Sequence, residues 1–119
     1  MNTQEFEALA KEYEDLTVAE LDGEFQKQLA LAEKGIGSAT RGSSFWNDLK
    51  PKIIAGIVRN RDVGSVTIGM ITSEVLTKVT AAGVDLQHYR VVIAIFIAVV
   101  AKAVWDTLEE RSKKSSSNP

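Results

Sequence analysis

The sequence contains no cysteine and only one histidine, His88, among its 119 residues. The absence of cysteine excludes disulfides, thiolate nucleophiles and cysteine-ligated zinc sites. One histidine, here in an Asp85-x-x-His88 pattern, cannot supply the two or three of a typical catalytic zinc site or the paired motifs of a di-iron bundle. No GxSxG motif accompanies it, so a serine triad is not indicated. We therefore expect no catalytic residue, no metal and no cofactor, and a protein that is not an enzyme.

A large net charge and an apolar leader are also missing. The formal net charge is −2, which gives no overall basic field to favour nucleic acid or an anionic membrane. The first twenty residues are polar and acidic, so we expect no secretory signal peptide and assign the protein to the cytoplasm. Hydrophobic residues make up 45% of the chain and charged residues 25%, which is typical of one soluble domain.

One stretch of the sequence is similar to a phosphate-binding loop but lacks a residue that the motif requires. The stretch GSATRGSS, residues 37–44, has the glycine spacing of a P-loop, but Ser43 stands where the motif needs a lysine. The segment before it reads as a charged helix, where a P-loop follows a buried strand. We interpret residues 36–44 as a Gly/Ser-rich loop.

Charge is distributed unevenly along the chain. Residues 1–35 carry nine acids and three bases, whereas residues 36–62 carry five bases and two acids. We expect both segments to be solvated faces, because surface ion pairs contribute little; the alternative is that the acidic segment folds onto the basic one of its own chain or of a neighbour. Bases beside Phe45 and Trp46 make the segment 41–61 a candidate for anion or nucleic-acid binding, which we rank third among possible functions. These bases are Arg41, Lys50, Lys52, Arg59 and Arg61.

Helical spacing of apolar residues dominates the N-terminal third. Residues 1–35 are predicted to form an acidic pair of helices. The second helix begins with a capping box, in which Thr17 caps the backbone and Glu20 reaches back to it. Gly35 is expected to end this helix. The sequence leaves open whether the pair packs on the rest of the chain or forms a detachable arm.

Residues 45–111 are predicted to form the helical core. Ser43 or Ser44 is expected to cap its first helix, Pro51 to begin a new stretch after a kink, and Asp62 or Ser65 to cap the next helix. A further break is expected where Gly83 ends one helix and Asp85 caps the last. Residues 112–119 are predicted to be a disordered tail. Because Val, Ile and Thr prefer strands, a mixed fold with strands at 53–58, 66–72 and 91–97 is the alternative.

The most distinctive feature is an apolar run of eleven residues, 91–101, near the C-terminus. The run is too short for a stable membrane span, which takes about 20 residues, and Lys102 interrupts its continuation. It is apolar on every side of the helix and must be covered almost completely. The sequence thus predicts an all-α, single-domain bundle of about five helices around an apolar C-terminal helix, with the cover completed in a homo-oligomer.

The expected function follows from these features. We expect a non-enzymatic protein–protein interaction or assembly module that associates with itself. The alternative is a membrane-docking, pore-forming or immunity-like protein that exposes the apolar hairpin 66–104 at a bilayer. Candidates for contact with a partner or a second copy are the large apolar residues of the last helix and of the segment after the loop. They are Phe45, Trp46, Val92, Ile93, Phe96, Val99, Val100, Val104 and Trp105.

Overall fold

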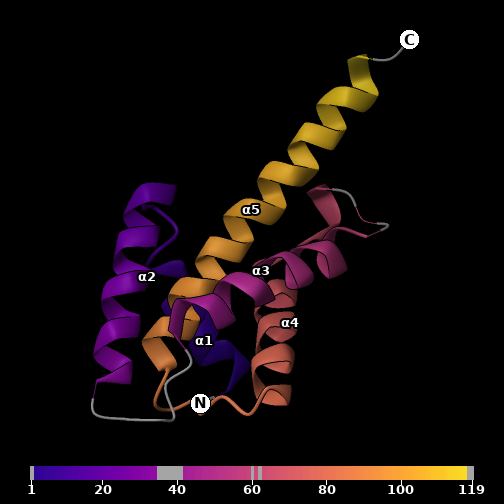
Figure 1. The fold of residues 1–119 in the computed structure, drawn as a ribbon. Helices are drawn as coiled ribbons and strands as arrows, with labels where there is room; N and C mark the ends of the chain where they lie inside the picture. The colour runs from indigo at the N-terminus through magenta and orange to yellow at the C-terminus, as the bar shows by residue number, and fades with distance from the viewer. Residues whose placement is uncertain (1, 35–41, 60, 62, 118–119) are drawn as a thin grey trace.

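The computed structural model describes residues 2–34, 42–59, 61 and 63–117. The described residues form five α-helices and a short 3₁₀ turn (Figure 1). Their bounds are Thr3–Lys11 for α1, Val18–Glu33 for α2, Gly42–Val58 for α3, Val63–Ser65 for η2, Ile68–Ala81 for α4 and Arg90–Ser117 for α5. The described part contains no strand, so the all-α prediction is confirmed and the mixed alternative is wrong.

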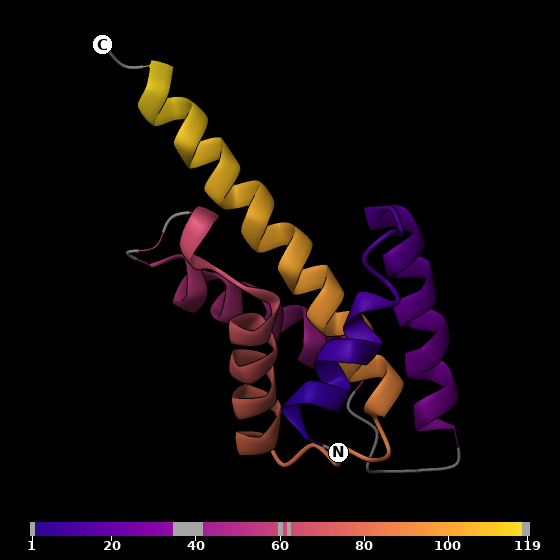
Figure 2. The ribbon, with the colours of Figure 1, turned by 180° about the vertical axis from the view of Figure 1, so that it is seen from behind.

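The last helix, α5, lies at the centre of the bundle. Each of the other four α-helices packs against it, and Figures 1 and 2 show that its final turns extend beyond them. From Val92 to Ala98 every side chain is buried. The predicted central apolar helix is therefore present, and the acidic pair α1–α2 packs on it. Most of the required cover comes from the chain itself.

Local sequence determines where several helices begin and end. The Thr17 side chain accepts a hydrogen bond from the Glu20 backbone N–H (3.1 Å), and the Glu20 carboxylate accepts one from the Thr17 N–H (3.0 Å). Both hydrogen bonds of the predicted capping box are thus formed. Gly83, at φ 80°, ends α4 as predicted. Its N–H donates to Thr80 and that of Val84 donates to Val79, which is a Schellman motif.

Pro51 does not begin a new helix, as the sequence had predicted, but lies inside α3. Proline in a helix interior removes one backbone hydrogen bond and costs about 3 kcal/mol. Residues on both sides of it nevertheless share one buried face, which includes Trp46, Ile53 and Ile57. Burial of this face offsets the local cost, so the helix continues through the proline.

Three further predicted boundaries are wrong. Thr67 caps α4 by accepting from the Met70 N–H (3.2 Å), whereas Ser65 belongs to η2 and Asp62 lies outside the described residues. Helix α3 begins at Gly42, two residues before the predicted end of the loop; residues 36–41 of that loop, and Gly35, lie outside the described part. Helix α5 continues to Ser117, so residues 112–117 are not a disordered tail. Extending a formed helix costs little, because each added residue gains a hydrogen bond.

Glu33, at the end of α2, ties three elements together. Its carboxylate accepts hydrogen bonds from the Gly42 N–H at the start of α3 (2.9 and 3.2 Å) and from the Tyr89 hydroxyl before α5 (3.3 Å). An acidic group at a helix N-terminus is favoured by unpaired N–H groups and the helix dipole. The His88 ring contacts the Ala32 carbonyl beside it. These bonds place the C-terminal end of α2 against the start of α3 and the approach to α5.

An aromatic cluster fills the space between α2, α3 and α5. The ring centroid of Trp46 lies 5.1 Å from that of Phe96 and 5.9 Å from that of Phe25. All three side chains are at most 5% exposed. Such rings contribute both large buried area and edge-to-face attraction. This cluster forms the inner end of the groove described next.

Candidate functional site

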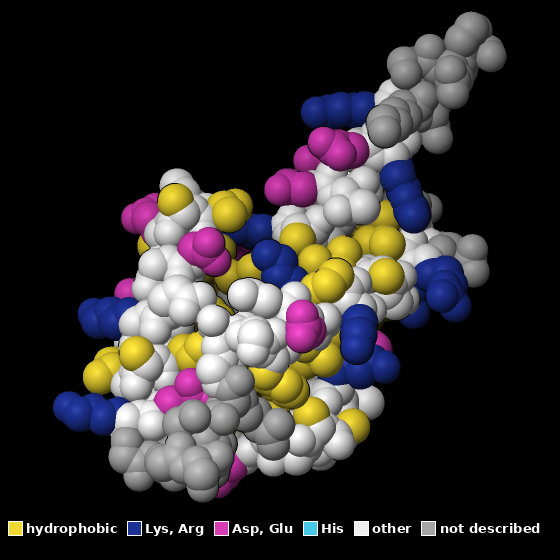
Figure 3. All heavy atoms as spheres, viewed as in Figure 1, with side chains coloured by type: hydrophobic (Ala, Val, Ile, Leu, Met, Phe, Trp, Pro, Cys, Tyr) yellow, Lys and Arg dark blue, Asp and Glu magenta, His cyan; other side chains and the backbone are white. Residues whose placement is uncertain are grey.

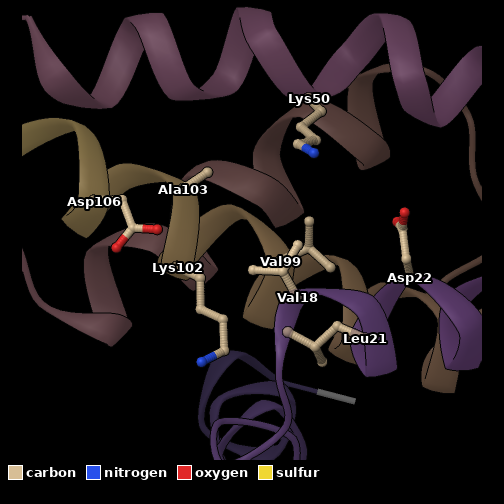
Figure 4. A pocket seen from close by; sticks show the side chains of 8 residues that line it. All are labelled: Val18, Leu21, Asp22, Lys50, Val99, Lys102, Ala103 and Asp106. Atoms are coloured by element: carbon tan, nitrogen blue, oxygen red, sulfur yellow. The ribbon is translucent and has the colours of Figure 1, made fainter.

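A groove opens between α2, α3 and α5, which we call the α2–α3–α5 groove (Figure 4). Its outer part has a volume of about 200 Å³. An inner extension of about 20 Å³, enough for one water molecule, reaches the aromatic cluster. The outer part is lined by Val18, Leu21, Asp22, Lys50, Val99, Lys102, Ala103 and Asp106. The inner extension shares Asp22, Lys50 and Val99 and adds Phe25, Trp46, Asn47 and Phe96.

The spacing of residues in each helix accounts for the groove. On α5, Phe96, Val99, Ala103 and Asp106 recur at intervals of three and four, so they share one face. Phe96 is buried at one end of this face, Val99 and Ala103 are half-buried, and Asp106 is exposed. The central helix is thus fully covered at the inner end and left partly open toward the outer end, where its neighbours diverge.

The groove combines an apolar centre with a charged rim. Figure 4 shows the side chains of Val18, Leu21 and Val99 in the middle of the group, with charged side chains around them. The space-filling view shows apolar side chains between α2 and α5 with basic ones beside them (Figure 3). The charged members are Asp22 and Asp106, which are exposed, and Lys50 and Lys102, which are half-buried.

None of these four charged groups forms an ion pair or hydrogen bond within the described part of the chain. The described ion pairs are Lys11–Glu7 (3.7 Å) and Lys78–Glu74 (4.0 Å), each within one helix. Apart from Glu33, the acids of residues 2–34 therefore make no ion pair with the described bases of residues 42–61. The groove charges remain available to a partner.

Two apolar side chains stand out on the surface. Val18, the first residue of α2, is 62% exposed and lines the mouth of the groove, and Leu31, near the other end of the same helix, is 56% exposed. Inside the groove region, the Trp46 indole N–H is buried without a hydrogen-bond partner in the described residues. An unsatisfied buried donor costs about 1–3 kcal/mol.

Most of the residues predicted for partner contact lie in the core of the chain itself. Half-burial leaves Phe45, Val99 and Trp105 partly accessible, and the Trp105 indole donates to the Val66 carbonyl (3.4 Å). Of the nine, the groove takes up only Val99, Phe96 and Trp46. Six of the nine are covered by other parts of the same chain, and contact of any of the nine with a second copy stays a prediction. The buried six are Trp46, Val92, Ile93, Phe96, Val100 and Val104.

The described bases of the predicted basic segment are exposed or half-buried, whereas one of its two aromatic rings is buried. Lys50 lines the groove, whereas Lys52, Arg59 and Arg61 are exposed and Arg41 lies outside the described residues. Stacking on bases needs accessible rings, but Trp46 is 1% exposed. Of the two rings, only Phe45 is partly accessible, and nucleic-acid binding by this segment stays a prediction.

Asp85 and His88 form hydrogen bonds that stabilise the turn before α5 and its contact with α2. The Asp85 carboxylate accepts hydrogen bonds from the Gln87 and His88 N–H groups (3.0 and 3.1 Å), capping the turn before α5. Within the described ranges, no group of three or more His, Asp or Glu residues could hold a metal ion. A shallow hollow of about 300 Å³ beside His88 is open to solvent along α2 and the start of α5.

The groove itself was missed from the sequence, apart from its residues Lys50, Val99, Phe96 and Trp46. The interruption of the apolar run by Lys102, followed by Asp106, was the available indication that one side of α5 faces solvent. Comparisons with protein-family models, with curated proteins and with solved structures found no match to this chain.

Proposed function

We propose that the protein is a non-enzymatic helical interaction module that binds protein partners, including other copies of itself, through the α2–α3–α5 groove. The observation that carries this proposal is the partly open face of α5 at Val99 and Ala103. There an apolar surface is bordered by four charged groups that have no partner in the described residues. Protein interfaces commonly combine an apolar centre with a polar rim.

The four charged groups of the groove surround an apolar centre. Asp22, Lys50, Lys102 and Asp106 make no hydrogen bonds to one another or to other described groups. Their arrangement around an apolar centre supports recognition of a surface.

Site-specific photo-crosslinking in the cells that produce the protein tests this function. A benzophenone amino acid replaces Val18 at the groove mouth, and a matched variant carries it at Leu31, a comparably exposed position on the same helix that lines the hollow beside His88. We expect the first variant to form discrete protein adducts, either with itself or with another protein, and the second to form none. If position 18 yields no adduct, or position 31 yields the same adducts, the groove is not an interaction site.

A second function, membrane docking, is favoured by the length of α5. The helical span Arg90–Lys113 contains an 18-residue window of mean hydropathy 2.2, so by length and composition it is able to cross a bilayer, although 61% of that window is buried. Lipid contact by the hairpin 66–104 requires the covering helices to move away. Flotation with neutral and with anionic vesicles tests this idea, and a protein that stays in the soluble fraction with both contradicts it.

A further inference from the structure

The mouth of the groove places an exposed apolar side chain directly beside an apolar hollow. Val18 is 62% exposed, and the hollow next to it is lined by Leu21, Val99 and Ala103. A protruding side chain and a recess in the same patch match one another when the patch is turned by 180° and brought against itself. This is the geometry of an isologous interface, in which one surface contacts its own copy.

The charges of the patch fit the same operation. Asp22 and Asp106 balance Lys50 and Lys102, so the groove as a whole is neutral while holding two separated charges of each sign. A patch with one sign of charge would repel its own copy, and a charge-balanced patch can place each acid against a base of the other copy. The lack of intrachain partners among the described residues leaves all four groups free for this.

We propose that a second copy of the chain occupies the groove across a two-fold axis. Val18 of each copy inserts between Leu21, Val99 and Ala103 of the other, and the acids of each rim pair with the lysines opposite. The site is then incomplete in the monomer, because the Val18 side chain of each copy fills the apolar hollow of the other copy. This inference rests on the proposed function and identifies its partner.

Sedimentation equilibrium of the purified chain tests the apolar contact. We expect wild type to be a concentration-dependent dimer. Val18→Asp should raise the dimer dissociation constant by about tenfold or more, because it replaces the inserted side chain with a charge at the centre of the interface. The control Leu31→Asp introduces the same charge at the distant exposed position and should leave the constant unchanged. Far-ultraviolet circular dichroism verifies that both variants remain helical.

A charge-exchange experiment tests the two-fold pairing. The double variant Asp22→Lys/Asp106→Lys makes the rim entirely basic, and Lys50→Asp/Lys102→Asp makes it entirely acidic. Each double variant alone should be monomeric, since identical rims then repel, and an equimolar mixture should form a heterodimer. This recovery in the mixture cannot arise from misfolding of either variant.

The outcomes separate this inference from the proposed function. If wild type is monomeric at every concentration while crosslinking at position 18 captures a different protein, the second copy is wrong and the interaction function stands. If wild type dimerises but Val18→Asp has no effect, or the all-basic variant dimerises as wild type does, the dimer uses another surface and the inference is overturned. If crosslinking at position 18 also fails, both proposals are wrong.

Discussion

Truncation of Phe96 tests whether the aromatic cluster between α2, α3 and α5 stabilises the monomer. Phe96 is 2% exposed, and its ring centroid lies 5.1 Å from that of Trp46 and 6.1 Å from that of Phe25. Replacing a buried Phe by Ala typically costs 3–5 kcal/mol through lost transfer free energy and the cavity left behind, so we expect about 4 kcal/mol for Phe96→Ala. That loss changes the ratio of folded to unfolded protein by about a thousandfold.

The matched control is Val99→Ala, one turn further along the same helix. Val99 is half-buried in the outer groove, so removing two methyl groups at half burial should cost about 1 kcal/mol. Both values come from urea unfolding followed by far-ultraviolet circular dichroism. The protein concentration must be the same and low, since any dimerisation adds apparent stability. The slope of the unfolding free energy against urea concentration should be the same in both variants as in wild type.

The comparison between the two variants decides the result. A loss under about 1 kcal/mol for Phe96→Ala would falsify the central position of this ring, because such small effects are typical of surface sites. Equal losses for the two variants would contradict the gradient of burial along this face of α5. In thermal unfolding, the expected loss corresponds to a decrease of roughly 15 °C in the midpoint.

Two further predictions concern local structure. Gly83→Ala should destabilise the protein by about 1 kcal/mol, because φ is 80° there. Gly23→Ala should stabilise it by about 0.5–1 kcal/mol, because Gly23 is an exposed position inside α2 where a Cβ meets no atom within 4 Å. Chemical denaturation measures both changes, and two changes of the same sign contradict this prediction. Hydrogen bonds from the backbone N–H and then the hydroxyl of Thr17 lower the pKa of the Glu20 carboxyl, so its charge stabilises the fold above the ordinary carboxyl pKa and this contribution is lost as the pH falls through the lowered value. Wild type should therefore exceed Glu20→Gln in stability near neutral pH, and unfolding curves at decreasing pH should show the difference shrinking rather than growing.

Features that depend on neighbouring residues were predictable from the sequence. The capping box at Thr17, the helix end at Gly83 and the apolar run within α5 each depend on side chains within one or two turns. Pro51 shows the limit of such reasoning. Its local cost favours a break, but burial of Trp46 on one side and Ile53 on the other outweighs that cost. Tertiary packing of this kind cannot be read from propensity.

The candidate site was predicted least well. The apolar character of α5 indicated that cover was needed, but not which helices supply it. The sequence predicts that large apolar residues such as Phe96 and Val100 contact a partner, whereas the structure buries them in the core that α5 forms with α1 to α4. The accessible site instead arises where three helices diverge, at Val18, Lys102 and Ala103. Such a junction joins positions more than 80 residues apart, which no local pattern encodes.

The order of the helices, with the central α5 after the four helices that pack on it, has a consequence for synthesis. The chain is synthesised from its N-terminus, so α1 to α4 emerge from the ribosome before α5, the helix against which all four pack. Their buried side chains, such as Phe6, Leu21, Ile53 and Val75, have no common partner until residues 90–108 have left the ribosome. The nascent chain therefore exposes apolar surface until α5 has emerged, and folding of the bundle waits for that helix. A growing chain of this kind is exposed to aggregation and is a natural client of chaperones.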